Sequence, residues 1–338
     1  MLPPLPIGEV LRDRYKITAY VGQGGMGSIY QADDLRLEGR LCAIKEVHND
    51  ESLTPEAQQQ ARDQFYREAS ILARLDHPNL PKVSDYFAIG ERDYLVMDFV
   101  PGRDLKEMTN EAKQNARFLS ETDVLSWATQ LCGALEYLHN QDHPIVHRDI
   151  KPSNLKVTPA GVLKLVDFGL VKLLASDERT VTVIQGLGTA YYTPLEQYGG
   201  DSGHTDGRTD IYSFGATLYH LLTNEPPAEA KQRFLRSDAL KSMRVINPAV
   251  SANTEQAILW AMALHPDDRP PDVATFREAL QPNNNLLVRA EGETLVVQPI
   301  IRLPSLTARI DRFLAAATLG LLLLAVLLTI FPFYANLH

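Results

Sequence analysis

The chain has 338 residues, and 33 Lys and Arg against 42 Asp and Glu give it a formal net charge of −9. This acidic balance argues against a general nucleic-acid binder. Hydrophobic residues make up 45% and charged residues 22% of the sequence, which excludes disordered and collagen-like chains. Two cysteines, Cys42 and Cys132, are too few for a disulfide framework and lack metal-ligand spacing, which favours a reducing compartment.

The first hundred residues are typical of β-strands interrupted by one helix. Short runs of β-branched or aromatic residues, bounded by Gly, Asp or Asn, predict strands at 15–21, 28–32, 41–47, 83–89 and 94–99. Apolar residues spaced three and four apart in a stretch rich in Ala, Gln, Arg and Glu predict a helix at 55–75.

Helical periods dominate after residue 120. Ser120 is the expected N-cap of a helix at 124–140, and further helices are predicted at 210–222, 254–264 and 273–280. The fold class is therefore α+β, with a small sheet-rich lobe at about 12–100 and a larger helical lobe at about 101–281.

A charge-free apolar run of 19 residues, 313–331, predicts a single transmembrane helix, since it would span about 28 Å as a helix. Three arginines, Arg302, Arg309 and Arg312, precede it and no Lys or Arg follows, so we expect residues 1–312 in the cytoplasm and 332–338 as a short extracytoplasmic tail. The N-terminus does not resemble a signal peptide. The juxtamembrane segment 282–312 can form a short hairpin of 286–289 with 294–298.

A G-x-G-x-x-G motif runs from Gly22 to Gly27 directly after a predicted strand. In a dinucleotide-binding fold a helix would begin at the last glycine, but 28–32 continues as a strand, which predicts a glycine-rich hairpin. Such a hairpin can lay its backbone N–H groups over phosphates. An ordinary flexible turn is the alternative.

A lysine and several carboxylates follow this hairpin. Lys45 ends an apolar strand run, and a lysine there is by itself usually an edge or snorkelling side chain. Glu68, 23 positions later on the predicted helix, could pair with it inside a cleft. The spacing does not choose Glu68 over the other carboxylates of that helix.

The most specific pattern is His-Arg-Asp-x-Lys-x-x-Asn at 147–154, followed by Asp-Phe-Gly at 167–169. Phosphoryl transfer needs a carboxylate for the substrate hydroxyl, a cation near the phosphoryl group and oxygen ligands for Mg²⁺. Asp149, Lys151, Asn154 and Asp167 supply this set. A charged turn between a helix and a strand is the alternative, but 163–166 is typical of a short buried strand leading into a cleft.

In this motif order the chain resembles eukaryotic-like Ser/Thr protein kinases of the bacterial, membrane-anchored type over residues 12–281. The resemblance implies the bilobal protein kinase fold, with ATP and Mg²⁺ as cofactors and Mn²⁺ as a substitute. By similarity Asp149 is the catalytic base, Lys151 stabilises the transferring charge, Glu68 orients Lys45, and Asn154 and Asp167 hold Mg²⁺. The implied ATP contacts are Val21, Gly22, Gln23, Gly24, Gly25, Met26, Gly27, Ile29, Ala43, Lys45, Met97, Asp98, Val100, Leu155 and Asp167.

The resemblance continues in the second half of the chain. Thr189 matches a substrate-docking loop, which together with Lys151 implies Ser or Thr as the acceptor. Glu196 ends a Pro-Leu-Glu variant of the family's Ala-Pro-Glu motif and should pair with Arg269. Asp210 matches the helix residue that braces the catalytic loop.

Arg148 directly precedes the catalytic aspartate, which in this family often makes activity depend on a phosphorylated activation loop. The candidate phosphorylation sites are Ser176, Thr180 and Thr182, with plain solvated loop residues as the alternative. Protein substrates and a homodimer that phosphorylates itself in trans are the implied partners. A membrane-tethered pseudokinase and a small-molecule kinase are the competing functions, although the docking loop and the Asp210 helix argue against the second.

Overall fold

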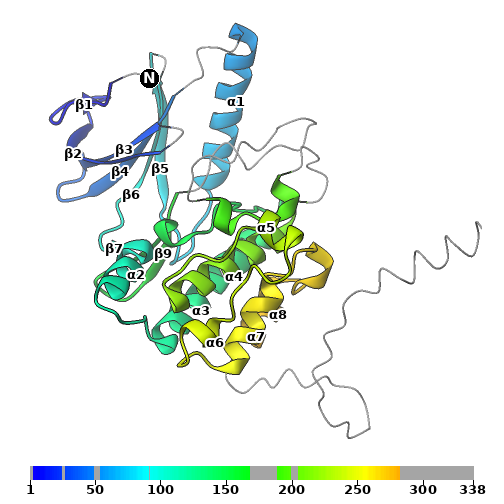
Figure 1. The fold of residues 1–338 in the computed structure, drawn as a ribbon. Coiled ribbons are helices and arrows are strands. Elements are labelled where there is room, and N and C mark those ends of the chain that lie inside the picture. Colours follow the sequence, from blue (N-terminus) through cyan, green and yellow to red (C-terminus); the bar gives the residue numbers. More distant parts are fainter. Residues whose placement is uncertain are drawn as a thin grey trace, which may run out of the picture. The chain divides into compact units, whose positions relative to one another are not determined.

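The structure is a computed structural model, and it describes residues 3–24, 27–48, 54–90, 92–167, 189–198 and 205–281 (Figure 1). All of them belong to one compact unit, Met1–Leu287. The predicted hairpin at 286–298, the apolar segment 313–331 and the phosphorylation candidates lie outside the described residues. Within the described part of the chain, no helix combines the length and apolar character needed to cross a membrane.

An antiparallel six-stranded sheet forms the first lobe, in the order β1-β2-β3-β4-β6-β5. Five of its strands confirm the predicted ones, whereas the two-residue β1 lacks a sequence signal. Tyr15, Tyr30 and Tyr94 are buried among its apolar side chains. The strands are β1 (Val10–Leu11), β2 (Tyr15–Gly24), β3 (Gly27–Asp34), β4 (Leu41–His48), β5 (Val83–Ile89) and β6 (Arg92–Asp98).

One helix, α1 (Pro55–Leu72), accompanies this sheet, as the sequence predicts. The Thr54 side chain caps it by accepting a hydrogen bond from the Ala57 N–H. Phe65, Ala69 and Leu72 lie on its buried face. The helix ends at Leu72, three residues before the predicted boundary, and the N–H groups of Arg74 and Leu75 then bond to carbonyls only three residues back.

The second lobe is mainly helical, and α4 runs through its centre (Figure 1). Nearly every residue of α4 is buried, and a Cβ at Gly215 would come within 2.9 Å of Ala261, so glycine allows the close approach of α7. The helices are α2 (Leu105–Gln114), α3 (Glu121–His139), α4 (Gly207–Thr223), α5 (Ala230–Leu235), α6 (Met243–Ile246), α7 (Ala252–Ala261) and α8 (Val273–Ala279). A small sheet joins β7 (Arg103–Asp104), β8 (Leu155–Val157) and β9 (Leu163–Leu165) in that order.

The predicted helices of this lobe are confirmed, and Ser120 caps α3 by accepting from the Asp123 N–H at 3.0 Å. Helix α2 was not predicted, because only Leu105 and Thr109 of its ten residues are buried.

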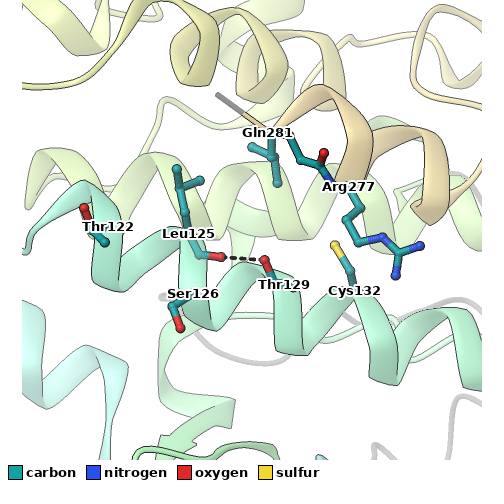
Figure 2. Close-up of a pocket in the computed structure, with 8 residues that line it drawn as sticks. Thr122, Leu125, Ser126, Thr129, Cys132, Arg277 and Gln281 are labelled. Carbon is teal, nitrogen blue, oxygen red and sulfur yellow. Dashed lines mark hydrogen bonds between the residues drawn. The ribbon is translucent and has the colours of Figure 1, made fainter. Parts of the chain in front are cut away.

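Helices α3 and α8 pack against each other around Cys132 (Figure 2). Arg277 of α8 lies 3.2 Å from Glu136 of α3, and a hollow of about 290 Å³ opens beside this pair. Both cysteines of the chain are buried free thiols, and burial raises the pKa of Cys132 to about 12.

Candidate active site

A pocket lies between the first sheet and the segment that follows α3. Nine of the residues predicted to bind ATP or Mg²⁺ line it together. Its lining combines apolar side chains with the polar groups of Lys45, Asn154 and Asp167. The nine are Val21, Ile29, Ala43, Lys45, Met97, Asp98, Val100, Asn154 and Asp167.

The glycine motif forms the predicted hairpin, because Gly24 of β2 pairs with Gly27 of β3. Gly27 has a φ of +150°, and a Cβ there would overlap the backbone carbonyl of Glu46 on the adjacent strand. Glycine is therefore required for the hairpin to lie against β4. Gly22 and Gln23 belong to the same hairpin, whereas Gly25 and Met26 are outside the described residues.

Leu155 is a correction to the predicted ATP contacts. Its side chain is 1% exposed and belongs to the core, whereas Lys156 lines the pocket with its ammonium 5.8 Å from the centre of the Phe99 ring. Successive side chains of β8 point to opposite faces of the strand, so the residue that faces the pocket is the one after Leu155. Asp104 also lines the pocket and was missed, since nothing around it in the sequence marks it.

Lys45 and Asp167 form a partly buried ion pair in the lining of this pocket. Burial alone would raise the pKa of Asp167, but the ammonium groups of Lys45 and Lys151 outweigh it and lower the pKa. Two residues that are 122 positions apart in the sequence are thus brought together, as the motifs predict.

Glu68 lies apart from this pair. Neither a hydrogen bond nor an ion pair within 4.0 Å joins the two described residues Glu68 and Lys45, so the structure does not bring about the predicted contact. The carboxylate instead accepts a hydrogen bond from Gln64 Nε2 at 3.0 Å, on its own helix. Burial raises the pKa of Glu68 to about 7, although Gln64 and the Arg148 guanidinium oppose the shift.

The catalytic-loop residues form one hydrogen-bonded group. Lys151 Nζ donates to both carboxylate oxygens of Asp149, at 3.1 and 2.9 Å. Asn154 Nδ2 donates to the Asp149 carbonyl at 2.8 Å and to its carboxylate at 3.1 Å. Lys151 Nζ also donates to Thr189 Oγ1 at 3.3 Å, which ties the predicted docking residue to the loop. Asp149 is therefore held by a cation on one side and an amide on the other.

Asp210 of α4 braces this loop, as predicted. Its carboxylate is fully buried and accepts the backbone N–H groups of His147 and Arg148 at 2.8 and 2.7 Å. His139 Nε2 lies 2.9 Å from the same carboxylate. Burial would raise the pKa of Asp210, but these hydrogen bonds and the nearby histidines lower it.

The brace holds a strained backbone. Arg148 has a φ of +64° and Asp167 a φ of +63°, a left-handed conformation that non-glycine residues rarely adopt. Such residues cost about 1–3 kcal/mol each and persist only where the surrounding structure holds them. One strained position directly precedes Asp149, and the other, Asp167, lines the pocket.

Glu196 and Arg269 form the predicted ion pair despite the departure from the family's motif. Arg269 contacts both carboxylate oxygens of Glu196, at 2.6 and 3.0 Å, and its side chain is fully buried. Its remaining donors go to the carbonyls of Ala263, Arg208 and Leu264. The pair fixes the segment after Thr189 against the helical lobe.

The donor set fits Mg²⁺. Asn154 and Asp167 place an amide and a carboxylate in the same pocket, and Mg²⁺ is commonly bound by one or two protein oxygens with phosphate and water as the other ligands. No cluster of three or more His, Cys, Asp or Glu side chains that could hold a metal by themselves occurs among the described residues.

Comparisons with known proteins agree with this geometry. Residues 15–281 match the family model described as protein kinase domain. The chain is 33% identical to a probable serine/threonine-protein kinase PknB of Lactococcus lactis, over 85% of this chain and 44% of that protein. It is 32% identical to the serine/threonine-protein kinase PknB of Mycobacterium tuberculosis, over 80% of this chain and 43% of that protein. The chain thus spans less than half the length of these curated relatives.

Solved structures give the same result for the fold. The structure titled "PpkA-294 apo form" superposes with a TM-score of 0.67 at 25% identity, covering 82% of this chain and 99% of that one. The PknI kinase domain of Mycobacterium tuberculosis gives a TM-score of 0.62 at 25% identity, with 82% and 98% coverage.

Proposed function

Because this chain belongs to the protein kinase family and resembles its bacterial Ser/Thr members, we propose that it transfers the γ-phosphoryl group of ATP to Ser or Thr hydroxyls of proteins. The family works with ATP and Mg²⁺. One observation supports transfer above all, namely that Asp149, Lys151 and Asn154 form a hydrogen-bonded group beside the pocket that contains Lys45 and Asp167. A scaffold that only binds nucleotide would not need this group.

Each residue has a role that its contacts suit. Asp149 accepts the proton of the substrate hydroxyl, and the bonds from Lys151 and Asn154 hold its carboxylate in one orientation. Lys151 also contacts Thr189, so its cation lies between the catalytic base and the docking segment, where charge on the transferring group would develop. Bound Mg²⁺ would neutralise phosphate charge at Asn154 and Asp167.

Lys45 and Glu68 complete the proposal. Lys45 would exchange part of its contact with Asp167 for the phosphates of the nucleotide, because both groups compete for the same ammonium. Glu68 would pair with Lys45 after a movement of α1, and the pKa of its carboxyl group would then fall as the cation approaches. The proposal therefore includes an approach of Glu68 to Lys45 before transfer.

The experiment is transfer of radiolabelled γ-phosphate from Mg-ATP by the 338-residue chain in detergent micelles, to itself and to two generic substrate proteins, one acidic and one basic. Asp149→Asn should lower the rate about 1,000-fold while ATP binding remains, since positioned acid–base catalysis contributes 10²–10⁴-fold. Asp142→Asn, an exposed carboxylate on the same segment, is the control. ATP binding without transfer by the unmodified chain, even with Mn²⁺, would instead establish a tethered pseudokinase.

We also propose that the chain phosphorylates its own activation loop, in trans within a homodimer, at Thr180 or Thr182 with Ser176 as a third candidate. Arg148 is the supporting feature, since an arginine beside the catalytic aspartate can bind a phosphate on that loop. Mass spectrometry after incubation with ATP should find these residues modified. An active enzyme with all three unmodified would contradict this proposal.

The apolar segment 313–331 and the three arginines before it support a further proposal, a single-pass location in the cell membrane with the kinase domain in the cytoplasm. Cell fractionation should recover the chain with membranes, and deletion of 313–331 should release it. Protease added to intact cells should leave the kinase domain uncut. Recovery of the intact chain in the soluble fraction would refute the location.

A further inference from the structure

A second pocket, of about 350 Å³, adjoins the catalytic loop, and Ser153 lines both this pocket and the one with the nucleotide residues. Three elements meet there, since its lining includes Lys106 of α2, His220 of α4 and Lys151, Ser153, Thr189 and Tyr192 from the catalytic and docking segments. Lys151 and Thr189 belong both to this pocket and to the group that holds Asp149. A substrate side chain in this pocket would therefore belong to a residue one or two positions away from the residue whose hydroxyl Asp149 would activate.

The pocket carries positive charge. Two lysines line it, and no carboxylate occurs among its described lining residues. Lys113 lies seven positions after Lys106 on α2, and residues with this spacing share a helix face. Helix α2 thus adds a second cation beside the pocket.

Three carboxylates on neighbouring segments already have cationic partners. Asp149 is paired with Lys151 at 2.9 Å, Glu111 of α2 with Arg103 at 2.6 Å, and Glu225 with Lys241 at 3.3 Å. They therefore do not cancel the charge of the α2 lysines.

His220 occupies the inner wall without adding a negative charge. Its Nδ1 lies 2.6 Å from the Tyr192 hydroxyl. Burial and the cations Lys113 and Lys106 lower the pKa of His220 to about 4, so the ring is neutral at physiological pH. The pocket therefore combines ammonium groups with neutral polar groups, a combination that suits an anion.

We propose that this pocket binds an acidic side chain, Asp or Glu, of the substrate protein next to the Ser or Thr acceptor. The proposal rests on the protein kinase function above and names the class of sequence that the enzyme phosphorylates. Lys106 and Lys113 are then specificity-determining residues, and basic peptides are poor substrates because their cations would face these lysines.

Binding tests the proposal without relying on transfer. The probes are fluorescein-labelled nonapeptides with Ala at the acceptor position. Each peptide carries a single Glu, Gln or Lys at one of the three positions before or after that Ala. Fluorescence anisotropy with the full chain in micelles should find one position at which Glu binds about fivefold more tightly than Lys, the range of one or two exposed ion pairs. Equal affinity of the Glu and Lys peptides at all six positions would overturn the proposal.

Charge reversal identifies the residues responsible. Lys106→Glu should abolish the preference, and Lys106→Glu with Lys113→Glu should invert it. Lys82→Glu is the control, since this exposed lysine pairs with Asp76 and lines neither pocket. A Glu preference that persists in the double variant would refute the assignment to this pocket.

Transfer assays with the same peptides carrying Thr at the acceptor separate this proposal from the kinase function. The expected result is a higher KM for Thr peptides in Lys106→Glu with kcat retained. If the unmodified chain transfers phosphate to none of the peptides but still prefers to bind the Glu peptide, the kinase function is contradicted and the acidic site remains supported.

Discussion

The two halves of the candidate active site are held in different ways. In the helical lobe, Asp210 bonds two backbone amides of the catalytic loop, and Lys151 and Asn154 both bond Asp149. In the sheet lobe, Lys45 pairs with Asp167, while Glu68 bonds Gln64 of its own helix. The first half is held by its own hydrogen bonds, whereas the second depends on where α1 lies.

This difference indicates which part of the site regulation can move. Groups fixed by buried bonds to the backbone cannot change position without partial unfolding, because each broken bond leaves a buried polar group unsatisfied. A side chain such as Glu68, whose hydrogen bond is within its own helix, moves with that helix at little cost. Regulation should therefore act on α1 and leave the catalytic loop unchanged.

The largest expected effect on stability comes from substituting Arg269, whose ion pair with Glu196 belongs to the helical lobe. Arg269→Met leaves the Glu196 carboxylate buried without its cation, which should lower the free energy of unfolding by about 3–5 kcal/mol. Thermal unfolding should shift down by roughly 10 °C for a domain of this size. Arg236→Met is the control, because Arg236 is 73% exposed and should shift the midpoint little. A similar shift for both variants would refute the buried pair.

Asp210→Asn attacks the brace itself. The Asn side chain has the same shape as Asp, but its NH₂ group would replace an oxygen that accepts a backbone N–H of the catalytic loop. This should cost about 2–3 kcal/mol of stability. We expect the amides of His147 and Arg148 to exchange their hydrogens faster, as measured by hydrogen–deuterium exchange, and kcat to fall. Unchanged exchange at these two amides would show that Asp210 does not hold the loop.

Gly27→Ala tests the sheet half through its backbone. The added Cβ would overlap the Glu46 carbonyl at a φ of +150°, so we expect a loss of about 2 kcal/mol and a higher KM for ATP. Gly22→Ala is the matched control on the same hairpin, since its Cβ would meet no atom within 4 Å of the described structure. Equal stability of the two variants would contradict the overlap.

Glu68→Gln should have the smallest effect and the most specific one. The buried carboxyl group keeps its proton up to about pH 7, whereas the unfolded chain releases it near pH 4.5, so the folded state binds more protons between these values. The free energy of unfolding contributed by Glu68 is therefore present below pH 4.5 and is lost as the pH rises to 7.

Urea denaturation at several pH values should show this fall in the unmodified chain and a flatter profile in Glu68→Gln. Transfer should drop about tenfold, the value of one charge-assisted hydrogen bond. Glu56→Gln, an exposed carboxylate on the same helix, should keep both the pH profile and the rate. A Glu56→Gln profile as flat as that of Glu68→Gln would refute a specific role for Glu68.

Much of the site could be predicted from short motifs, because phosphoryl transfer demands particular groups at close spacing along the chain. Asp149, Lys151 and Asn154 lie within six residues of one another, and the structure confirms their contacts. The Glu196–Arg269 pair spans 73 positions and was predicted only through the family resemblance.

Other features depend on packing that local patterns do not encode. Leu155 and Lys156 are adjacent, and only the direction of β8 within its sheet decides which one faces the pocket. The position of Glu68 depends on how α1 lies against the sheet. Helix α2 escaped prediction because it is only ten residues long and most of them are polar, yet it supplies Lys106 to the proposed acidic site.

The left-handed backbone at Arg148 has a consequence for the order of folding. The brace that satisfies its amide comes from Asp210, which is 62 positions later in the chain. The catalytic loop can therefore keep its shape only after α4 has packed, and it should be among the last parts of the lobe to form. Substitutions in this loop should then speed unfolding while leaving the folding rate almost unchanged.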